Sequence, residues 1–344
     1  DVHDIHVYPG PDMPPLEEKR ASVLGEFGGL GLPLQDHLWQ AGESNWGYRT
    51  FEQQDIFETR YVDLIRKTYQ LVDKGLTAAV YTQTTDVEVE VNGLMTYDRK
   101  VIKLDPKRFA AVNQGYVPPT FTSDRTLFID SIEVGLTGAR DPEIRYTLDG
   151  SDPTQSSTLY TKPISITKPV TIKARCFWKN GNASPVVSQT YRKPEKISPA
   201  VEADVQKEGL RFDAYQGQWS SMPDFDSMTA VKSGIASKVD ASYAGLDENF
   251  GMRFTGYINI PKTGVYQLSL VSDDGSKLYL DGTELIDNDG LHGVEELNAE
   301  LALEAGWHPV TVEFFQGGGG YEVGLLWEGP GIEKTPISSD ALGH

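Results

Sequence analysis

The sequence has a single cysteine, Cys176, among 344 residues. One thiol excludes an intramolecular disulfide and a cysteine-rich metal cluster. Because Cys176 lies in the apolar run 172–178, we expect a core residue rather than a reactive thiol. No apolar run approaches the roughly 18–20 residues that a membrane span needs. The sequence therefore predicts no membrane span.

Positive charge is also scarce, with 31 Lys and Arg against 50 Asp and Glu and a formal net charge of -19. Such a field repels phosphate backbones and anionic membranes, so we expect no nucleic-acid partner. Neutral ligands such as sugars, and calcium ions, are compatible with it. Hydrophobic residues make up 39%, which is enough for packed cores. At about 100–200 residues per domain, the length predicts two or three domains.

The sequence shows no signal peptide. It begins at Asp1, without an initiator Met and inside a strand-like run. We therefore expect a fragment or a processed product, from which any targeting signal could have been lost.

The sequence pattern changes twice along the chain. Residues 1–112 combine short apolar runs with helical spacing at 54–74, which predicts a parallel sheet with crossover helices. Residues 113–194 lack helical spacing, and short alternating runs between turn clusters predict a β-sandwich. Residues 195–344 are predicted to be all-β as well, with Asp281-Gly282 as a hairpin turn.

The string Gly25-Glu26-Phe27-Gly28-Gly29 places a carboxylate at the end of a buried strand, two residues before a pair of glycines. In a (β/α) barrel this rim carries the active site. The alternative is a strand-end glutamate that caps a helix or faces solvent.

Residues 4–11 and 20–29, with 81–86 and 92–99, resemble glycoside hydrolase family 2, the β-galactosidase and β-glucuronidase family. In that family these segments are the last three strands of a barrel with their loops. The resemblance thus implies a glycoside hydrolase and a multidomain fold, in which a partial (β/α) TIM barrel over 1–112 precedes two all-β sandwiches, 113–194 and 195–344.

The resemblance also assigns roles to residues. Glu26 would be the nucleophile, Tyr8 and His6 would contact the site, and Trp46 would line the sugar pocket. Gln83 and Asn92 are further substrate-contact candidates that only the resemblance suggests.

A retaining glycosidase needs two carboxylates about 5–5.5 Å apart. The family's acid/base glutamate follows an asparagine, and this sequence has no Asn-Glu pair. We therefore predict that the 344 residues alone do not hydrolyse glycosides. Turnover of aryl β-glycosides that is abolished by Glu26→Ala would contradict this.

Other polar residues in the first segment have plainer explanations. His3 and His6 would point to opposite faces of a strand, so a polar lining is favoured over a metal site. Asp86, Glu88 and Glu90 alternate with valines, which indicates an ordinary strand with a solvated acidic face.

Residues 144–154, Tyr160 and 172–175 resemble the C-terminal immunoglobulin-like domain of chitobiases and β-hexosaminidases. Asp149-Gly150 and Asp152-Pro153 are turn residues rather than a convergent polar cluster. The resemblance implies a structural spacer, with weak sugar binding as the alternative.

Several strings in the last segment resemble the protective-antigen type (PA-14) domain over nearly all of 200–335: 209–215, 250–258, 264–266, 272–276, 287–293, 306–310 and 326–330. In its sugar-binding members, paired aspartates hold a calcium ion that chelates sugar hydroxyls, and Asp273 and Asp274 match that pair. Calcium takes six to eight oxygens, some from a ligand. A plain Asp-Asp-Gly turn is the alternative.

The leading hypothesis is the C-terminal portion of a retaining, exported β-glycosidase, periplasmic or extracellular in a bacterium. Its partner would be a glycan substrate or a polysaccharide. The rival is a non-catalytic carbohydrate-binding or adhesion protein. A third possibility is that the last module mediates protein contacts.

Overall fold

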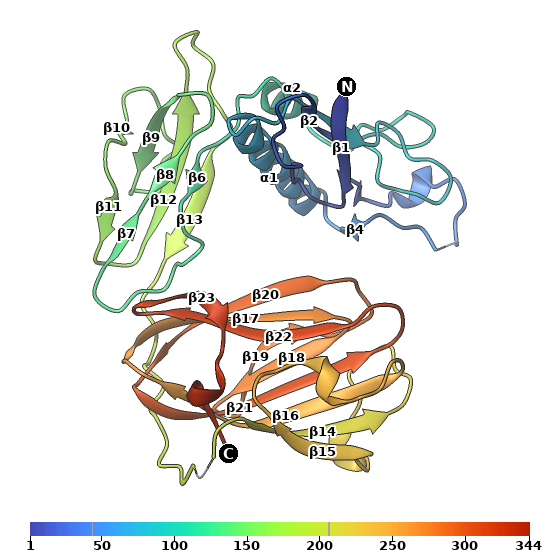
Figure 1. Cartoon of the computed structure of the whole chain (residues 1–344). Helices are drawn as coiled ribbons and strands as arrows, with labels where there is room; N and C mark the ends of the chain where they lie inside the picture. Colours follow the sequence, from blue (N-terminus) through green and yellow to red (C-terminus); the bar gives the residue numbers. More distant parts are fainter. Residues whose placement is uncertain (43, 206) are drawn as a thin grey trace. The chain divides into compact units, whose positions relative to one another are not determined.

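A computed structural model describes residues 1–42, 44–205 and 207–344 (Figure 1). The chain divides into two compact units. Unit 1 contains Asp1–Asp124, Glu133–Ile166 and Val170–Thr190. Unit 2 contains Arg125–Ile132, Thr167–Pro169 and Tyr191–His344.

A three-stranded parallel sheet begins unit 1, in the order β1 (Val2–Val7), β2 (Ala21–Gly28) and β5 (Ala78–Thr82). Helix α1 (Gln54–Val72) connects β2 to β5 and confirms the predicted helix. Its apolar side, with Phe57 and Tyr61, packs in one core with Leu24 and Phe27 of the sheet. The carboxyl ends of all three strands therefore lie at one edge.

The expected partial (β/α) barrel is wrong. Loop 8–20 joins β1 to β2 without a helix, so the described residues of 1–112 contain a single strand–helix–strand crossover. The three-stranded sheet is open, and three strands do not close around a core. In the described part of the chain, α-helix is confined to α1 and α2 (Pro106–Asn113), and two short strands, β3 (Leu30–Gly31) and β4 (Arg49–Thr50), pair in parallel beside the sheet.

The rest of unit 1 is all-β, as the alternating runs predicted. Cys176 is buried there, and burial raises the pKa of its thiol to about 12, which confirms a core residue. The sheet orders are β10-β9-β12-β13, β11-β7 and β6-β8. The strands are β6 (Thr120–Phe121), β7 (Ile132–Val134, whose first residue belongs to unit 2), β8 (Leu136–Thr137), β9 (Glu143–Thr147), β10 (Thr158–Leu159), β11 (Ile164–Ile166), β12 (Val170–Phe177) and β13 (Val187–Tyr191, whose last residue belongs to unit 2).

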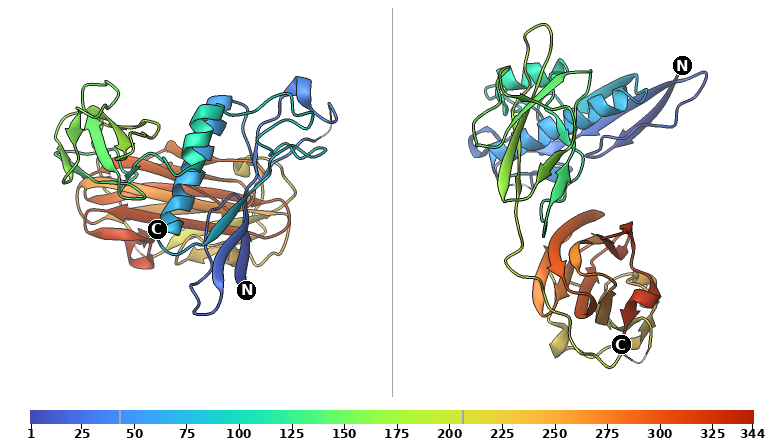
Figure 2. Two further views of the ribbon diagram at one scale, coloured as in Figure 1. Left: turned by 90° about the horizontal axis from the view of Figure 1, so that it is seen from above. Right: turned by 90° about the vertical axis from the view of Figure 1, so that its left-hand side faces the viewer.

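Unit 2 consists of a seven-stranded and a four-stranded sheet that enclose one core (Figure 2). The larger sheet has the order β15-β14-β16-β21-β18-β19, with β24 also beside β16, and the smaller has the order β20-β17-β22-β23. The strands are β14 (Leu210–Gln216), β15 (Lys232–Ala236), β16 (Phe250–Ile260), β17 (Gly264–Asp273), β18 (Ser276–Leu280), β19 (Thr283–Asn288), β20 (Glu295–Leu303), β21 (Gly306–Gln316), β22 (Glu322–Gly329), β23 (Ile332–Pro336) and β24 (Leu342–Gly343).

A row of alternating charges crosses the larger sheet in register. Its members, which we call the charge ladder, pair across neighbouring strands: Asp213 with Arg253, Arg253 with Glu313, Glu313 with Lys277, and Lys277 with Asp287. Opposite charges directly across a strand pair stabilise a sheet.

Two turns of unit 2 contain residues that the sequence analysis named. The Asp281-Gly282 turn between β18 and β19 has φ values of 51° and 74°, which confirms the predicted hairpin. The turn from β17 to β18 passes from the smaller sheet to the larger, and it carries Asp273 and Asp274.

Neither α1 nor α2, the α-helices of the described residues, has the length and apolar character of a membrane-spanning helix.

Candidate functional site

Glu26 lies near the carboxyl end of β2, and two side chains from β1 and its following loop approach it. Tyr8 donates a hydrogen bond from its hydroxyl to Glu26 Oε2. His6 Nδ1 lies 3.8 Å from the same oxygen, and His6 Nε2 lies 3.3 Å from Asp4 Oδ2. Burial and the bond to Glu26 raise the pKa of Tyr8 to about 12, so Tyr8 remains a neutral donor.

Two exposed aromatic rings continue this arrangement. Tyr48 stacks on Tyr8 with ring centroids 3.8 Å apart, and Trp46 meets Tyr48 edge-on at 5.5 Å. Gly29 makes room for the stack: its φ is +66°, and a Cβ there would lie 2.4 Å from the Tyr48 ring. The second glycine of the sequence motif thus admits an aromatic ring beside the carboxylate.

The backbone holds Trp46 against the segment that follows β5. Trp46 N donates to the carbonyl of Val89 at 3.0 Å, and Val91 N donates to the carbonyl of Trp46 at 2.8 Å. In the same segment, Gln83 Nε2 donates to Asn92 Oδ1, and Asn92 Nδ2 donates to Glu90 Oε1, both at 2.9 Å. Asn92 is fully buried, so its two hydrogen bonds hold this loop together from the inside.

The prediction of a solvated acidic strand at 86–90 is wrong. Asp86 is buried, and its Oδ1 accepts hydrogen bonds from Lys103 Nζ at 2.7 Å and Gly93 N at 2.8 Å. Burial raises the pKa of Asp86 and lowers that of Lys103, and their ion pair opposes both shifts. This buried pair joins the two ends of the loop that carries Asn92.

The sequence reasoning also missed a second aromatic pair. Trp39 and Tyr97 meet edge-on with ring centroids 5.4 Å apart. Next to them, His37 Nδ1 lies 2.9 Å from Asp98 Oδ2, and Thr96 Oγ1 donates to Asp98 Oδ1 at 2.6 Å. The clustering of Trp39, Trp46 and Tyr48 in the loop after Glu26 is the sequence signal that could have revealed these rings.

Asp98 provides an acid-sensitive test of this loop anchor. Its bonds from Thr96, His37 and the Lys100 amide hold the pKa of Asp98 well below its usual range. The stabilisation is therefore present above the unfolded pKa of about 3.9 and is lost as pH falls below it. We expect the protection factors of the amides of residues 35–39, which correct for the intrinsic exchange rate at each pH, to fall between about pH 4 and 2. Asp98→Asn should be nearly insensitive to pH in that window, and an equally pH-dependent variant would contradict the assignment.

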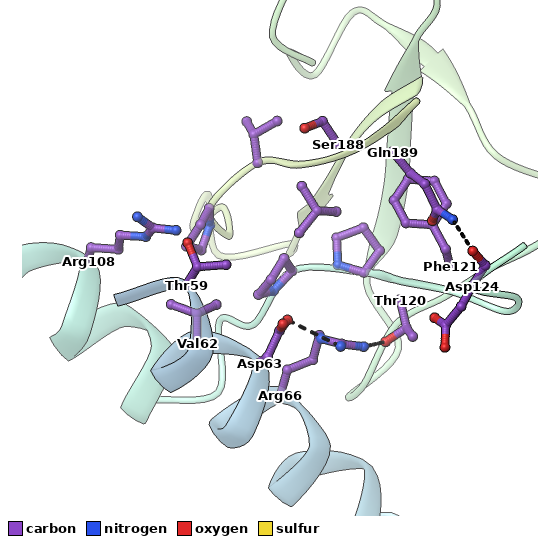
Figure 3. A pocket seen from close by; sticks show the side chains of 15 residues that line it. Thr59, Val62, Asp63, Arg66, Arg108, Thr120, Phe121, Asp124, Ser188 and Gln189 are labelled. Carbon is purple, nitrogen blue, oxygen red and sulfur yellow. Dashed lines mark hydrogen bonds and ion pairs between the residues drawn. The ribbon is translucent and has the colours of Figure 1, made fainter. Parts of the chain in front are cut away.

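A cavity of about 360 Å³ lies elsewhere in unit 1, between α1, α2 and residues 118–124 and 185–189 (Figure 3). Its polar side chains largely serve internal contacts: Arg66 donates to Thr120 and Asp63, and Gln189 donates to the Asp124 carbonyl. The sequence-predicted site residues do not line it. We therefore place the candidate site at Glu26.

In unit 2, Asp274 connects two loops. Its Oδ1 accepts from His292 N at 3.1 Å and its Oδ2 from Gly317 N at 2.8 Å. The Asp273–Asp274 peptide bond is cis. Burial, followed by the charges of Asp274 and Glu322, raises the pKa of Asp273.

The surrounding loops are ordered by further contacts. The ring nitrogens of His292 lie 2.8 Å from the Gly293 carbonyl and 3.1 Å from the Asn288 carbonyl. Leu291 and Tyr321 remain exposed. Within 1–42, 44–205 and 207–344, no three or more His, Cys, Asp and Glu side chains gather as a metal cluster. A cation at this turn would need additional oxygens from the backbone, water or a ligand.

Strands β14 to β23 of these two sheets, with the Asp-Asp-Gly turn between them, lie within residues 186–341, which match the PA14 domain family. This segment is a PA14 domain. The resemblance found over 200–335 is thereby confirmed. Residues 134–191, which overlap the start of the PA14 match, match the family described as "Fn3 associated".

Two curated relatives match parts of the chain. A β-hexosaminidase of Porphyromonas gingivalis is 30% identical over 241 residues, which are 65% of this chain and 30% of that protein. The anti-sigma-I factor RsgI3 of Acetivibrio thermocellus is 26% identical over 133 residues, which are 37% of this chain and 21% of that protein. The chain thus spans less than a third of the length of these relatives.

Among solved structures, the PA14 domain of the antifreeze protein MpAFP is 19% identical, with a TM-score of 0.36. The match covers 42% of this chain and 96% of that domain. A PA14 sugar-binding domain from an RTX adhesin is 16% identical with a TM-score of 0.36, covering 40% of this chain and 99% of that domain.

Proposed function

We propose that this chain is the C-terminal, carbohydrate-handling portion of an exported, retaining β-glycosidase. The observation that carries the proposal is Glu26: a carboxylate at the carboxyl ends of parallel strands, bonded to Tyr8 and flanked by exposed aromatic rings. Ligands of open parallel sheets bind at that edge. Aromatic faces beside a carboxylate suit a sugar ring, which combines apolar C–H faces with hydroxyls.

In this proposal Glu26 attacks the anomeric carbon, and Tyr8 orients the carboxylate through its hydrogen bond. Trp46 and Tyr48 form the wall against which the sugar ring stacks. Retention requires a second carboxylate about 5–5.5 Å away as the acid/base. It would come from residues outside this chain, because the Asn-Glu pair that the resemblance implies does not occur in this sequence. The 344 residues alone are therefore expected to be inactive.

Covalent trapping tests this role directly. The protein is isolated as its source cell makes it and is treated with 2-deoxy-2-fluoro aryl β-glycosides, which arrest a retaining enzyme at its glycosyl-enzyme intermediate. Peptide mass spectrometry should find the label on Glu26, and Glu26→Gln should abolish it. Glu88→Gln, which changes an exposed glutamate, is the matched control. A label on another carboxylate, or hydrolysis that survives Glu26→Gln, would contradict the assignment.

We further propose that the PA14 domain binds glycans with the help of calcium at Asp273 and Asp274. The residue types fit calcium, because Asp273 and Asp274 are adjacent carboxylates. Burial first, and then the charge of Asp274, raise the pKa of Asp273, and a divalent cation would relieve that repulsion. A bound calcium ion would supply open coordination positions for vicinal sugar hydroxyls. Asp274 would at the same time hold the two loops beside the ligand.

A glycan array distinguishes this proposal from its rivals. We expect binding in calcium that is lost in excess chelator and in Asp273→Asn. The control Asp287→Asn changes an aspartate that pairs with Lys277 and should bind normally. Binding that persists in chelator would remove calcium from the mechanism. Glycan binding without a Glu26 label in the trapping experiment would favour the non-catalytic adhesion function.

A further inference from the structure

Two of the attachments between the loop after β2 and the loop after β5 each display a tryptophan. At the first, the backbone of Trp46 bonds to Val89 and Val91. At the second, His37 pairs with Asp98 and Trp39 packs edge-on against Tyr97. Both loops follow the carboxyl ends of parallel strands, at the edge that carries Glu26.

Trp39 is unusual because it is both anchored and exposed. Its side chain is 54% exposed, while its edge-on contact with Tyr97 is nearly perpendicular, at 86°. Perpendicular packing uses the edge of one ring and leaves indole surface in water, where a large apolar face is unfavourable. The pKa of Asp98 is held low, so its carboxylate stays charged, and it holds His37, two residues before Trp39, at 2.9 Å. The ring is thus preorganised without being used in the core.

We infer that Trp39 and Tyr97 form a second carbohydrate-contact surface, so that the Glu26 site takes an oligosaccharide rather than a single glycoside unit. This inference rests on the proposed sugar-handling function of Glu26. The seven residue-to-residue steps from Trp39 to Trp46 can span at most about 25 Å, which keeps both tryptophans within the reach of a short glycan.

The chemistry favours a neutral glycan. The net charge of -19 disfavours anionic polymers, and the exposed indole offers an apolar face to sugar C–H groups. The hydroxyl and carboxylate groups of Thr96 and Asp98 already bond to each other. Stacking rather than hydrogen bonding therefore dominates recognition at this surface.

Fluorine NMR of the intact chain tests the inference. The six tryptophans are replaced biosynthetically by 5-fluorotryptophan, and Trp39→Phe and Trp46→Phe assign two of the signals. The probes are β-1,4-linked oligomers of galactose, glucose and N-acetylglucosamine, from one to six units. We expect short oligomers of the accepted sugar to shift the Trp46 signal alone and longer ones to shift both signals. Trp39→Ala should weaken binding of the hexamer about tenfold and leave binding of the monomer unchanged.

The outcomes separate two failures. A Trp46 signal that moves while the Trp39 signal never does would reject the second surface and leave the proposed function standing. If neither signal moves with any probe, the second surface and the proposed sugar-handling function of Glu26 are both rejected for this chain. A Trp39 signal that depends on protein concentration, and not on sugar, would assign the pair to self-association and overturn the inference. Trp39→Phe, which keeps an aromatic ring, should bind the hexamer better than Trp39→Ala does.

Discussion

Lys103→Ala is expected to lower the free energy of unfolding of unit 1 by about 3–5 kcal/mol, because it leaves the carboxylate of Asp86 buried without a partner. Lys103 is only 1% exposed, and its Nζ also donates to the Val91 carbonyl at 2.8 Å. The loss should appear first in the loop after β5. Hydrogen exchange of residues 83–104, followed by mass spectrometry, measures it without requiring the two units to unfold together.

The control for this prediction is Lys100→Ala, in which the lysine is exposed and pairs with Asp98 at 3.5 Å. An exposed ion pair of this kind contributes at most about 1 kcal/mol. The double variant Asp86→Asn with Lys103→Met removes both charges and should recover much of the loss. If Lys103→Ala were no more harmful than Lys100→Ala, the buried ion pair would not stabilise the loop.

The second large effect is expected for Asp274→Ala in the PA14 domain. The substitution removes two hydrogen bonds to a charged acceptor, each of which contributes about 1.5–3 kcal/mol, so we expect a loss of about 3 kcal/mol or more. Residues 289–294 and 317–321 should then exchange amide hydrogens faster. Calcium-dependent glycan binding should be lost together with the order of these two loops.

Asp287→Ala is the matched comparison, because Asp287 is exposed and forms an ion pair with Lys277 at 3.1 Å. Its cost should stay below about 1 kcal/mol. Asp274→Asn retains one acceptor oxygen and should fall between the two alanine variants. Equal exchange rates in the two alanine variants would show that Asp274 does not hold the loops.

Local sequence signals predicted local structure well and long-range pairing poorly. The 3.6-residue spacing over 54–74 located α1, and Asp281-Gly282 located a hairpin, because both depend on neighbouring residues. The barrel expectation failed because closure depends on how many strands come together, which strand-by-strand resemblance does not determine.

The candidate site was predicted only in part. Tyr8 and Glu26 were placed together by a family resemblance and do contact each other. Asp86 was misread because alternation with valines imitates a strand, while its partner Lys103 is 17 residues away in sequence. The stack of Tyr48 on Tyr8 joins residues 40 positions apart, which periodicity cannot reveal.

The charge ladder has a consequence for how the PA14 domain avoids misassembly. A strand that slips by one residue turns every side chain to the opposite face. For β16 or β21, a slip would direct Arg253 or Glu313 into the apolar interior, and for β18 it would do the same to Lys277. Misregistered pairings are thus penalised by ion burial, which favours the native register of the central strands of this sheet.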